Sequence, residues 1–271
     1  MKKAISLFFA LVFGGQLYAQ SGLPAIAGAR GAAMGNATVG FQDINSIFAN
    51  QAGLAHLKRS AFTAIAENRF VGFDLRSVAA AAAIPGPAGT FGLALQYFGI
   101  EEYNEQKVGL AYARKLSDRI AIGAQIDFLR LQVQDFNSQN LVTFEAGLQS
   151  QVSKQLTLGV YLYSPARVTT VGDESLPTIF KLGGFYRASS KLRLALEVEK
   201  DLDFPAEIHL GLEYQIIEAL AIRLGTQTQP NEVSLGFGYL VQEQVQLDVA
   251  ATYHEILGIT PSFSATYQWN K

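Results

Sequence analysis

The sequence predicts an all-β protein: a transmembrane antiparallel β-barrel of about 14 strands with an N-terminal plug segment in its lumen. Three observations support this fold class. From Ala61 onward, stretches of roughly eight to twelve residues alternate between apolar and small or polar side chains, as strands do. Hydrophobic residues make up 49% of the chain and charged residues only 16%. Residues 29–57 form the one long segment after the N-terminal leader that does not alternate.

The alternating stretches carry charges on the face opposite to their leucines. In residues 192–199, Arg193 and Glu197 share a face with Ala195 and alternate with three leucines. A soluble sandwich would turn its apolar faces inward to interlock, whereas a membrane barrel turns them outward to lipid and lines its lumen with polar residues. Since lipid offers no hydrogen-bond partners, such a sheet must close on itself. We therefore expect residues 59–271 to form the barrel, and an even strand number places both termini on the periplasmic side.

The connections and the aromatic residues agree with this topology. Connections on the periplasmic side are predicted to be short, as at residues 153–155 and 189–191, while residues 164–177 form a longer one on the opposite side. Aromatic residues recur just before the short turns and at the end of the last strand, which predicts an interfacial girdle. They are Tyr112, Tyr186, Tyr214, Tyr239, Tyr267 and Trp269.

Residues 1–19 have the features of a signal peptide. Lys2 and Lys3 precede an apolar run over residues 5–13, and a small-residue cleavage site ends at Ala19. The apolar run is too short to span a membrane as a helix. We expect a mature chain that starts at Gln20 and resides in the bacterial outer membrane. The chain has no cysteine, so the fold must be stable without disulfides.

Residues 20–58 are predicted to form the plug. Small residues dominate residues 29–37, and apolar patches follow at residues 39–41 and 44–48. Small side chains allow close packing in a narrow lumen, so we expect this segment in the periplasmic half of the barrel. The alternative is a tail that lies on the surface.

Charged residues on the inward faces of the strands are interpreted as a wall network. Opposite charges on neighbouring strands can pair with each other or with Arg30 or Asp43 of the plug. A role in guiding a substrate is the alternative. The expected members are Lys181, Arg193, Glu197, His209, Glu213, Arg223 and Asp248.

One stretch departs from the alternation. Ile120, Ile122, Ile126 and Phe128 share a face, yet apolar residues continue on the other face from Leu129 to Val133. A β-bulge near residues 128–130 would return these side chains to the outer face. We therefore predict a bulge in this strand.

Several classes of function are excluded by what the chain lacks. A net charge of −2 without a basic cluster argues against nucleic acid as a partner. The three histidines, His56, His209 and His254, are scattered, and no serine is placed to form a nucleophile–base pair with them. We expect no catalytic site, no metal site and no cofactor.

The order of motifs resembles the FadL superfamily of outer-membrane barrels, and within it the PorV/PorQ-like group. The group's N-terminal pattern is similar to residues 29–35 (ARGAAMG), followed by Asp43 and by residues 50–54 (NQAGL). Gln51 stands where the family usually has proline. The residues that carry the plug motif are Arg30, Met34, Gly35, Asp43, Asn50, Ala52, Gly53 and Leu54.

The resemblance implies two possible functions. PorV-like and PorQ-like barrels are accessories of type IX protein secretion or surface attachment, with exported or surface-anchored proteins as partners besides outer-membrane lipid. FadL-like barrels transport hydrophobic small molecules through a plug and a side opening. We rank the accessory role first because the inward positions of the later strands are largely polar, which suits an acyl chain poorly. Residues 98–105 and 164–177 would then form the docking rim.

Overall fold

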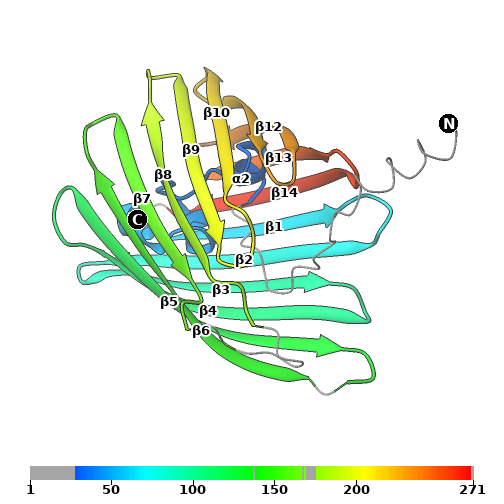
Figure 1. Cartoon of the computed structure of the whole chain (residues 1–271). Coiled ribbons are helices and arrows are strands. Elements are labelled where there is room, and N and C mark those ends of the chain that lie inside the picture. The colour runs from blue at the N-terminus through cyan, green and yellow to red at the C-terminus, as the bar shows by residue number, and fades with distance from the viewer. Residues whose placement is uncertain (1–27, 137, 167, 169–174, 270–271) are drawn as a thin grey trace, which may run out of the picture.

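The computed structural model describes residues 28–136, 138–166, 168 and 175–269. The predicted signal peptide and the first residues of the predicted plug lie outside this part of the chain. The described residues form a closed antiparallel barrel of 14 strands, which confirms the predicted fold class (Figure 1). The strands are β1 (Ala61–Arg69), β2 (Leu75–Gly86), β3 (Gly89–Gly99), β4 (Tyr103–Lys115), β5 (Ile120–Val133), β6 (Gln139–Gln151), β7 (Leu156–Tyr163), β8 (Ile179–Arg187), β9 (Leu192–Asp201), β10 (Glu207–Ile217), β11 (Leu220–Gln227), β12 (Glu232–Val241), β13 (Val245–His254) and β14 (Gly258–Gln268).

Each strand pairs with its neighbours in sequence, and β1 closes the barrel by pairing with β14. Both ends of the barrel chain, Ala61 and Gln268, face each other in that ladder. We call this the terminal end of the barrel and the other end the distal end. The turns at the terminal end are short, and the longest connection, residues 164–178, lies at the distal end.

The predicted bulge in β5 is wrong. Phe128 pairs with Val108 on one side and Val142 on the other, and Leu129 follows in unbroken register on both. Leu129 points inward and is buried against Leu141 and Leu176, with Phe98 packed beside them. Leu129 needs no bulge, because it belongs to a small apolar cluster inside the barrel.

The outer face of the barrel is mainly apolar. Along β5, Ile122, Ile126 and Phe128 are exposed, while Gln125 and Asp127 between them are buried. The tyrosines of the predicted girdle lie near the terminal ends of their strands, with Tyr186, Tyr214, Tyr239 and Tyr267 exposed on the outer face. This arrangement is the one by which strands cross a membrane.

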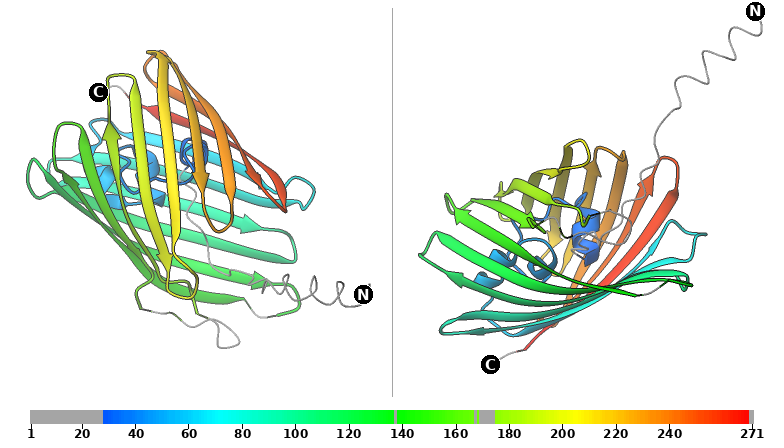
Figure 2. Two further views of the ribbon diagram at one scale, coloured as in Figure 1. Left: turned by 45° about the horizontal axis from the view of Figure 1, so that its top comes forward. Right: turned by 60° about the horizontal axis from the view of Figure 1, so that its bottom comes forward.

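Residues 28–57, which we call the luminal segment, lie inside the barrel (Figure 2). The segment contains the short helix α2 (Gly28–Ala33) and the 3₁₀ helices η1 (Ile44–Phe48) and η2 (Gln51–His56). Asp43 caps η1 by accepting a hydrogen bond from the Asn45 amide, and Asn50 caps η2 in the same way through the Ala52 amide. No helix in the described ranges is long and apolar enough to cross a membrane.

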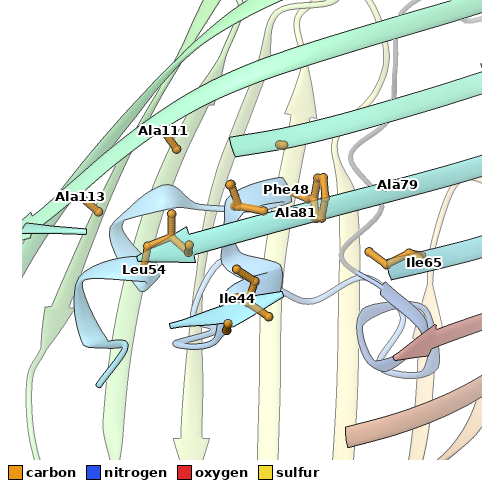
Figure 3. Close-up of a cluster of buried hydrophobic side chains, with 12 residues drawn as sticks. Ile44, Phe48, Leu54, Ile65, Ala79, Ala81, Ala111 and Ala113 are labelled. Atoms are coloured by element: carbon orange, nitrogen blue, oxygen red, sulfur yellow. The ribbon is translucent and has the colours of Figure 1, made fainter. Parts of the chain in front are cut away.

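The luminal segment packs its apolar side chains against alanines of the wall. In the cluster that Figure 3 shows, Ile44 and Phe48 of η1 and Leu54 of η2 pack with small wall side chains, among them Ala79 and Ala81 of β2 and Ala111 and Ala113 of β4. Each of the three apolar side chains is fully buried, which stabilises the packing by about 1.5–3 kcal/mol per side chain. Alanine on the wall leaves the space that these larger residues fill.

Glycines bring the wall and the luminal segment into backbone contact. At each of eight inward glycines, a Cβ atom would come within 3 Å of an atom of the luminal segment. At Gly147 the nearest atom is Asn50 Oδ1, 2.0 Å from that Cβ position, and at Gly225 it is the Gly35 amide nitrogen, also at 2.0 Å. The wall is therefore fitted to the segment on eight different strands. The positions are Gly92, Gly123, Gly147, Gly159, Gly183, Gly211, Gly225 and Gly236.

Candidate functional site in the barrel lumen

Arg30 joins the luminal segment to the wall. Its Nε lies 2.8 Å from Glu213 Oε2, and its Nη2 lies 3.1 Å from Glu213 Oε1, so the guanidinium binds this carboxylate with two nitrogens. Its Nη1 lies 2.6 Å from Asp43 Oδ2. The guanidinium carbon sits 4.4 Å from the centroid of the Phe41 ring. Burial alone would lower the pKa of Arg30, but Glu213 and Asp43 outweigh burial and hold this pKa above its ordinary value.

Glu213 is the centre of the first charge cluster. Arg223 Nε donates to Glu213 Oε2 at 2.7 Å, and Arg193 binds Glu213 Oε1. Both arginines stand directly opposite Glu213 in the ladders of β11 and β9. Arg223 Nη1 continues the cluster to Asp248 Oδ1 at 2.7 Å. The structure thus brings together four of the seven residues of the predicted wall network. This cluster lines a cavity of about 500 Å³ near the terminal end.

The other three predicted network residues form a second cluster closer to the distal end. Lys181 Nζ lies 2.7 Å from Glu199 Oε2 and 3.4 Å from Glu197 Oε1. Glu197 Oε2 accepts hydrogen bonds from the Thr38 and Val39 amides, each at 2.7 Å, so it also holds the luminal segment. The predicted network omitted Glu199, although it alternates in phase with Glu197 along β9 and therefore faces the same way.

A third cluster lies in the wall at β4–β6 and was not predicted. Lys107 Nζ lies 2.9 Å from Glu145 Oε1 and 4.0 Å from Asp127 Oδ1, and all three side chains are buried. The Gln51 amide donates to Glu145 and, at 3.1 Å, to the Ile47 carbonyl. Gln51 therefore fills a place that proline could not, because proline has no side-chain donor.

The remaining residues of the plug motif pack or turn the chain. Met34 is fully buried and contacts the wall at Gly211. Gly35 has a φ of +61°, and a Cβ on Gly53 would lie 2.2 Å from the Phe41 carbonyl oxygen. Ala52 and Leu54 are completely buried. The residues of the plug motif thus make their contacts inside the barrel.

A cavity of about 430 Å³ lies between the luminal segment and the distal ends of the strands. Asn36 of the luminal segment lines it, together with Glu199, Glu207 and His209 of β9 and β10. Aromatic side chains, among them Phe70, Tyr161 and Tyr163, also face it. The predicted network included His209 but missed Glu207, two residues earlier on the same face of the strand.

The outer face carries a separate apolar groove of about 910 Å³ across β7–β11. Leucines line it, and its floor includes Gly183, Gly211 and Gly225, whose inner sides contact the luminal segment. Gly184 points outward and leaves the groove open between Leu156 and Leu158. A single backbone layer separates lipid from Met34 and Gly35 at this place.

Of the other two histidines, His254 lines the same cavity as His209. His254 Nδ1 accepts hydrogen bonds from the Ile256 and Leu257 amides and so closes a turn. His56 ends η2, where burial, together with the positive charges of Lys115 and Arg187, lowers its pKa to about 4. In the part of the chain that the structure covers, no three His, Cys, Asp or Glu side chains are arranged to hold a metal ion.

The closed barrel and its apolar exterior define the class: the chain is a bacterial outer-membrane β-barrel. No protein-family model matches the sequence, and no curated protein matches it. Solved structures of FadL-family barrels are similar over almost the whole chain. The CymD monoaromatic hydrocarbon channel has a TM-score of 0.71 at 11% identity and covers 93% of this chain and 100% of its own.

Two further solved structures are similar to the same degree. The toluene transporter TbuX of Ralstonia pickettii has a TM-score of 0.70 at 13% identity, over 92% of this chain and 99% of its own. A FadL homologue of Pseudomonas aeruginosa has a TM-score of 0.69 at 13% identity, over 93% of this chain and 100% of its own. These likenesses establish a shared fold. The expected membership of the PorV/PorQ-like group stays a prediction.

Proposed function

We propose that this barrel lets small hydrophobic molecules cross the outer membrane. This reverses the ranking expected from the sequence, in which a secretion accessory came first. The similar structures support the change, since they include a monoaromatic hydrocarbon channel and a toluene transporter that match over nearly their whole length. The neighbours give no support to catalysis, because they are channels and transporters.

The observation that carries the proposal is that the outer groove and the luminal segment lie on opposite sides of the same stretch of barrel wall. The groove is lined by leucines and lies in the lipid-facing wall. Behind its floor, Gly211 and Gly225 contact Met34 and Gly35 directly. An apolar molecule that entered the lumen would need to cross only this layer to reach lipid, where its transfer from water is favourable.

The luminal segment would act as the gate, because it occupies the lumen at this height. Few side-chain hydrogen bonds hold residues 35–36 to the wall. Asn36 Nδ2 donates to Gln227 Oε1 at 3.1 Å, the Gly35 amide donates to Ser234 Oγ at 3.2 Å, and the Gly35 carbonyl accepts from His209 Nδ1 at 2.8 Å. Movement of this short stretch would open the lumen without unfolding the barrel.

A reversible cross-link tests whether the gate must move. The chain has no cysteine, so Asn36→Cys with Gln227→Cys introduces the only two thiols. In cells that produce this variant, oxidation should abolish uptake of labelled toluene, and dithiothreitol should restore it. The matched control is Val241→Cys with Val245→Cys, which joins paired residues of the β12–β13 hairpin away from the gate. Equal uptake by the oxidised and reduced gate variant would contradict the proposal.

A role as an accessory for exported or surface-anchored proteins is the second candidate. The polar inward positions of β9–β13 favour it, since a wall need not bind an apolar cargo to support a docking rim. The rim would comprise residues 98–105 and the described part of residues 164–177. Deletion of the gene distinguishes the two: lost surface display with normal toluene uptake would replace transport by the accessory role.

A further inference from the structure

We propose that the distal cavity binds the primary ammonium group of a small organic amine through His209, Glu199 and Glu207. This inference rests on the proposed transport function and adds a cargo class to it: aromatic or alkyl amines, besides neutral hydrocarbons such as toluene.

The Gly35 carbonyl fixes the tautomer of His209. The Nδ1 atom lies 2.8 Å from the Gly35 oxygen, and a carbonyl oxygen can only accept, so Nδ1 carries the proton. In the neutral ring, Nε2 is then an acceptor with a free lone pair. His209 is only 3% exposed, and its Nε2 has no hydrogen-bond partner. A buried acceptor without a donor is costly unless a ligand supplies one.

Two carboxylates face the same point. Glu199 Oε2 and Glu207 Oε2 each lie 3.7 Å from His209 Nε2. Glu199 and Glu207 stand directly opposite each other in the β9–β10 ladder, where like charges are destabilising. Three acceptors therefore converge on one region of the cavity. A primary ammonium has three N–H donors and one positive charge, so it matches the three acceptors in number and the carboxylates in sign.

Among the charged side chains that line the cavity, two carboxyl groups lack a cationic partner. Glu199 is paired with Lys181, and Glu67 with Arg69 at 2.9 Å. Glu207 and Glu232 have no Lys or Arg within 4.0 Å among the described residues, although both line the cavity. Neither carboxyl group therefore has a cationic side chain as its partner, and a cationic ligand would supply one, whereas the carboxylate of a fatty acid would not.

The shape and the walls of the cavity indicate an organic cation. Its volume of about 430 Å³ exceeds what one ion needs. Phe70, Tyr161 and Tyr163 provide aromatic surface for the apolar body of a ligand, and aromatic rings also attract ammonium groups. The cavity is therefore suited to a molecule with a charged head and an apolar body.

Matched probes on the detergent-solubilised full chain test the site. Titration calorimetry would compare 2-phenylethylamine with 2-phenylethanol, phenylacetate and the N-trimethylated amine. We expect the primary amine to bind at least tenfold more tightly than the alcohol, and phenylacetate to bind most weakly. The trimethylated amine keeps the charge but has no N–H donor, so it should bind more weakly than the primary amine. Equal affinity of the amine and the alcohol would overturn the proposal.

Two variants test whether the amine binds at this site. Glu207→Gln should weaken amine binding about tenfold and leave the alcohol unchanged, while Glu101→Gln, an exposed carboxylate on the β3–β4 turn, should change neither. Unchanged amine affinity in Glu207→Gln would contradict the assignment.

Toluene uptake separates the two proposals. Amine binding without any uptake would retain the site and reject transport, whereas uptake of toluene without amine binding would reject the site alone.

Discussion

Arg30 and Glu213 are 183 residues apart in sequence, yet the guanidinium of one binds both carboxylate oxygens of the other. The contact joins α2, the first helix of the luminal segment, to β10, whereas η2 contacts strands β4–β6. Glu213 is almost completely buried, so its charge requires the arginines that surround it. The contact therefore fixes both the position of the segment and the charge balance of the wall.

Replacing Arg30 should destabilise the barrel. Arg30→Met leaves Asp43 unpaired and Glu213 with two arginines, so we expect a loss of about 2–3 kcal/mol, less than for a wholly unpaired buried charge. Arg30→Lys should restore only part of the loss, because an ammonium cannot bind a carboxylate with two nitrogens in a fixed plane. Urea unfolding in detergent micelles measures the change. Arg69→Met, which breaks a more exposed pair with Glu67, is the control and should cost less than about 1 kcal/mol. Equal losses in the two variants would argue against a special role for Arg30.

A methyl group at Gly147 should disturb the luminal segment. The added Cβ would overlap Asn50 Oδ1, the atom that caps η2. The side-chain amide nitrogen of the same residue, Asn50 Nδ2, donates to the Val39 carbonyl at 2.9 Å. We expect Gly147→Ala to cost about 1–3 kcal/mol and to expose the segment to protease. Gly184→Ala is the matched control, because its Cβ points outward, where its nearest atoms are the movable end of Leu158 at 3.0 Å and the Thr157 carbonyl oxygen at 3.3 Å. A protease-resistant segment in Gly147→Ala would show that the close contact is not needed.

The sequence was sufficient to predict the wall but not every contact inside it. Alternation has a period of two, so it assigns each strand residue to a face, and the wall charges from Lys181 to Asp248 were predicted to point inward on that ground. The expected partners Arg30 and Asp43 also lie in the first cluster. Strand order is sequential, so neighbours in the chain are neighbours in space.

Contacts that depend on how the luminal segment folds could not be predicted. Gln51 meets Glu145 only because η2 places it against β4–β6. Leu129 was misassigned because an apolar residue on the polar face suggests a bulge, whereas the lumen holds an apolar cluster of its own. The closeness of His209 to Glu199 requires the register of β9 and β10, which alternation alone does not specify.

Cysteines within the luminal segment should be protected from water-soluble reagents. Ala33 and Ala49 are both fully buried between the segment and the wall. In the folded barrel, Ala33→Cys and Ala49→Cys should resist a charged maleimide and react only after heat denaturation. Lys154→Cys, on an exposed turn at the terminal end, is the control and should react at once. Rapid labelling of both buried positions would mean that the segment leaves the lumen in solution.

Acid should weaken the fold partly through His56. Burial and the charges of Lys115 and Arg187 lower the pKa of this imidazole to about 4, from an ordinary value of 6.5. Between these two values the unfolded chain binds more protons at this site than the folded chain, so stability is lost as pH falls through this window. Above the window the site contributes no pH dependence. The temperature at which the barrel loses its heat-modifiable gel mobility, measured after incubation at pH 7 and at pH 4.5, reports the effect. Wild type should lose more thermal stability on acidification than His56→Gln, which cannot be protonated there; an equal loss in both would place the acid sensitivity elsewhere.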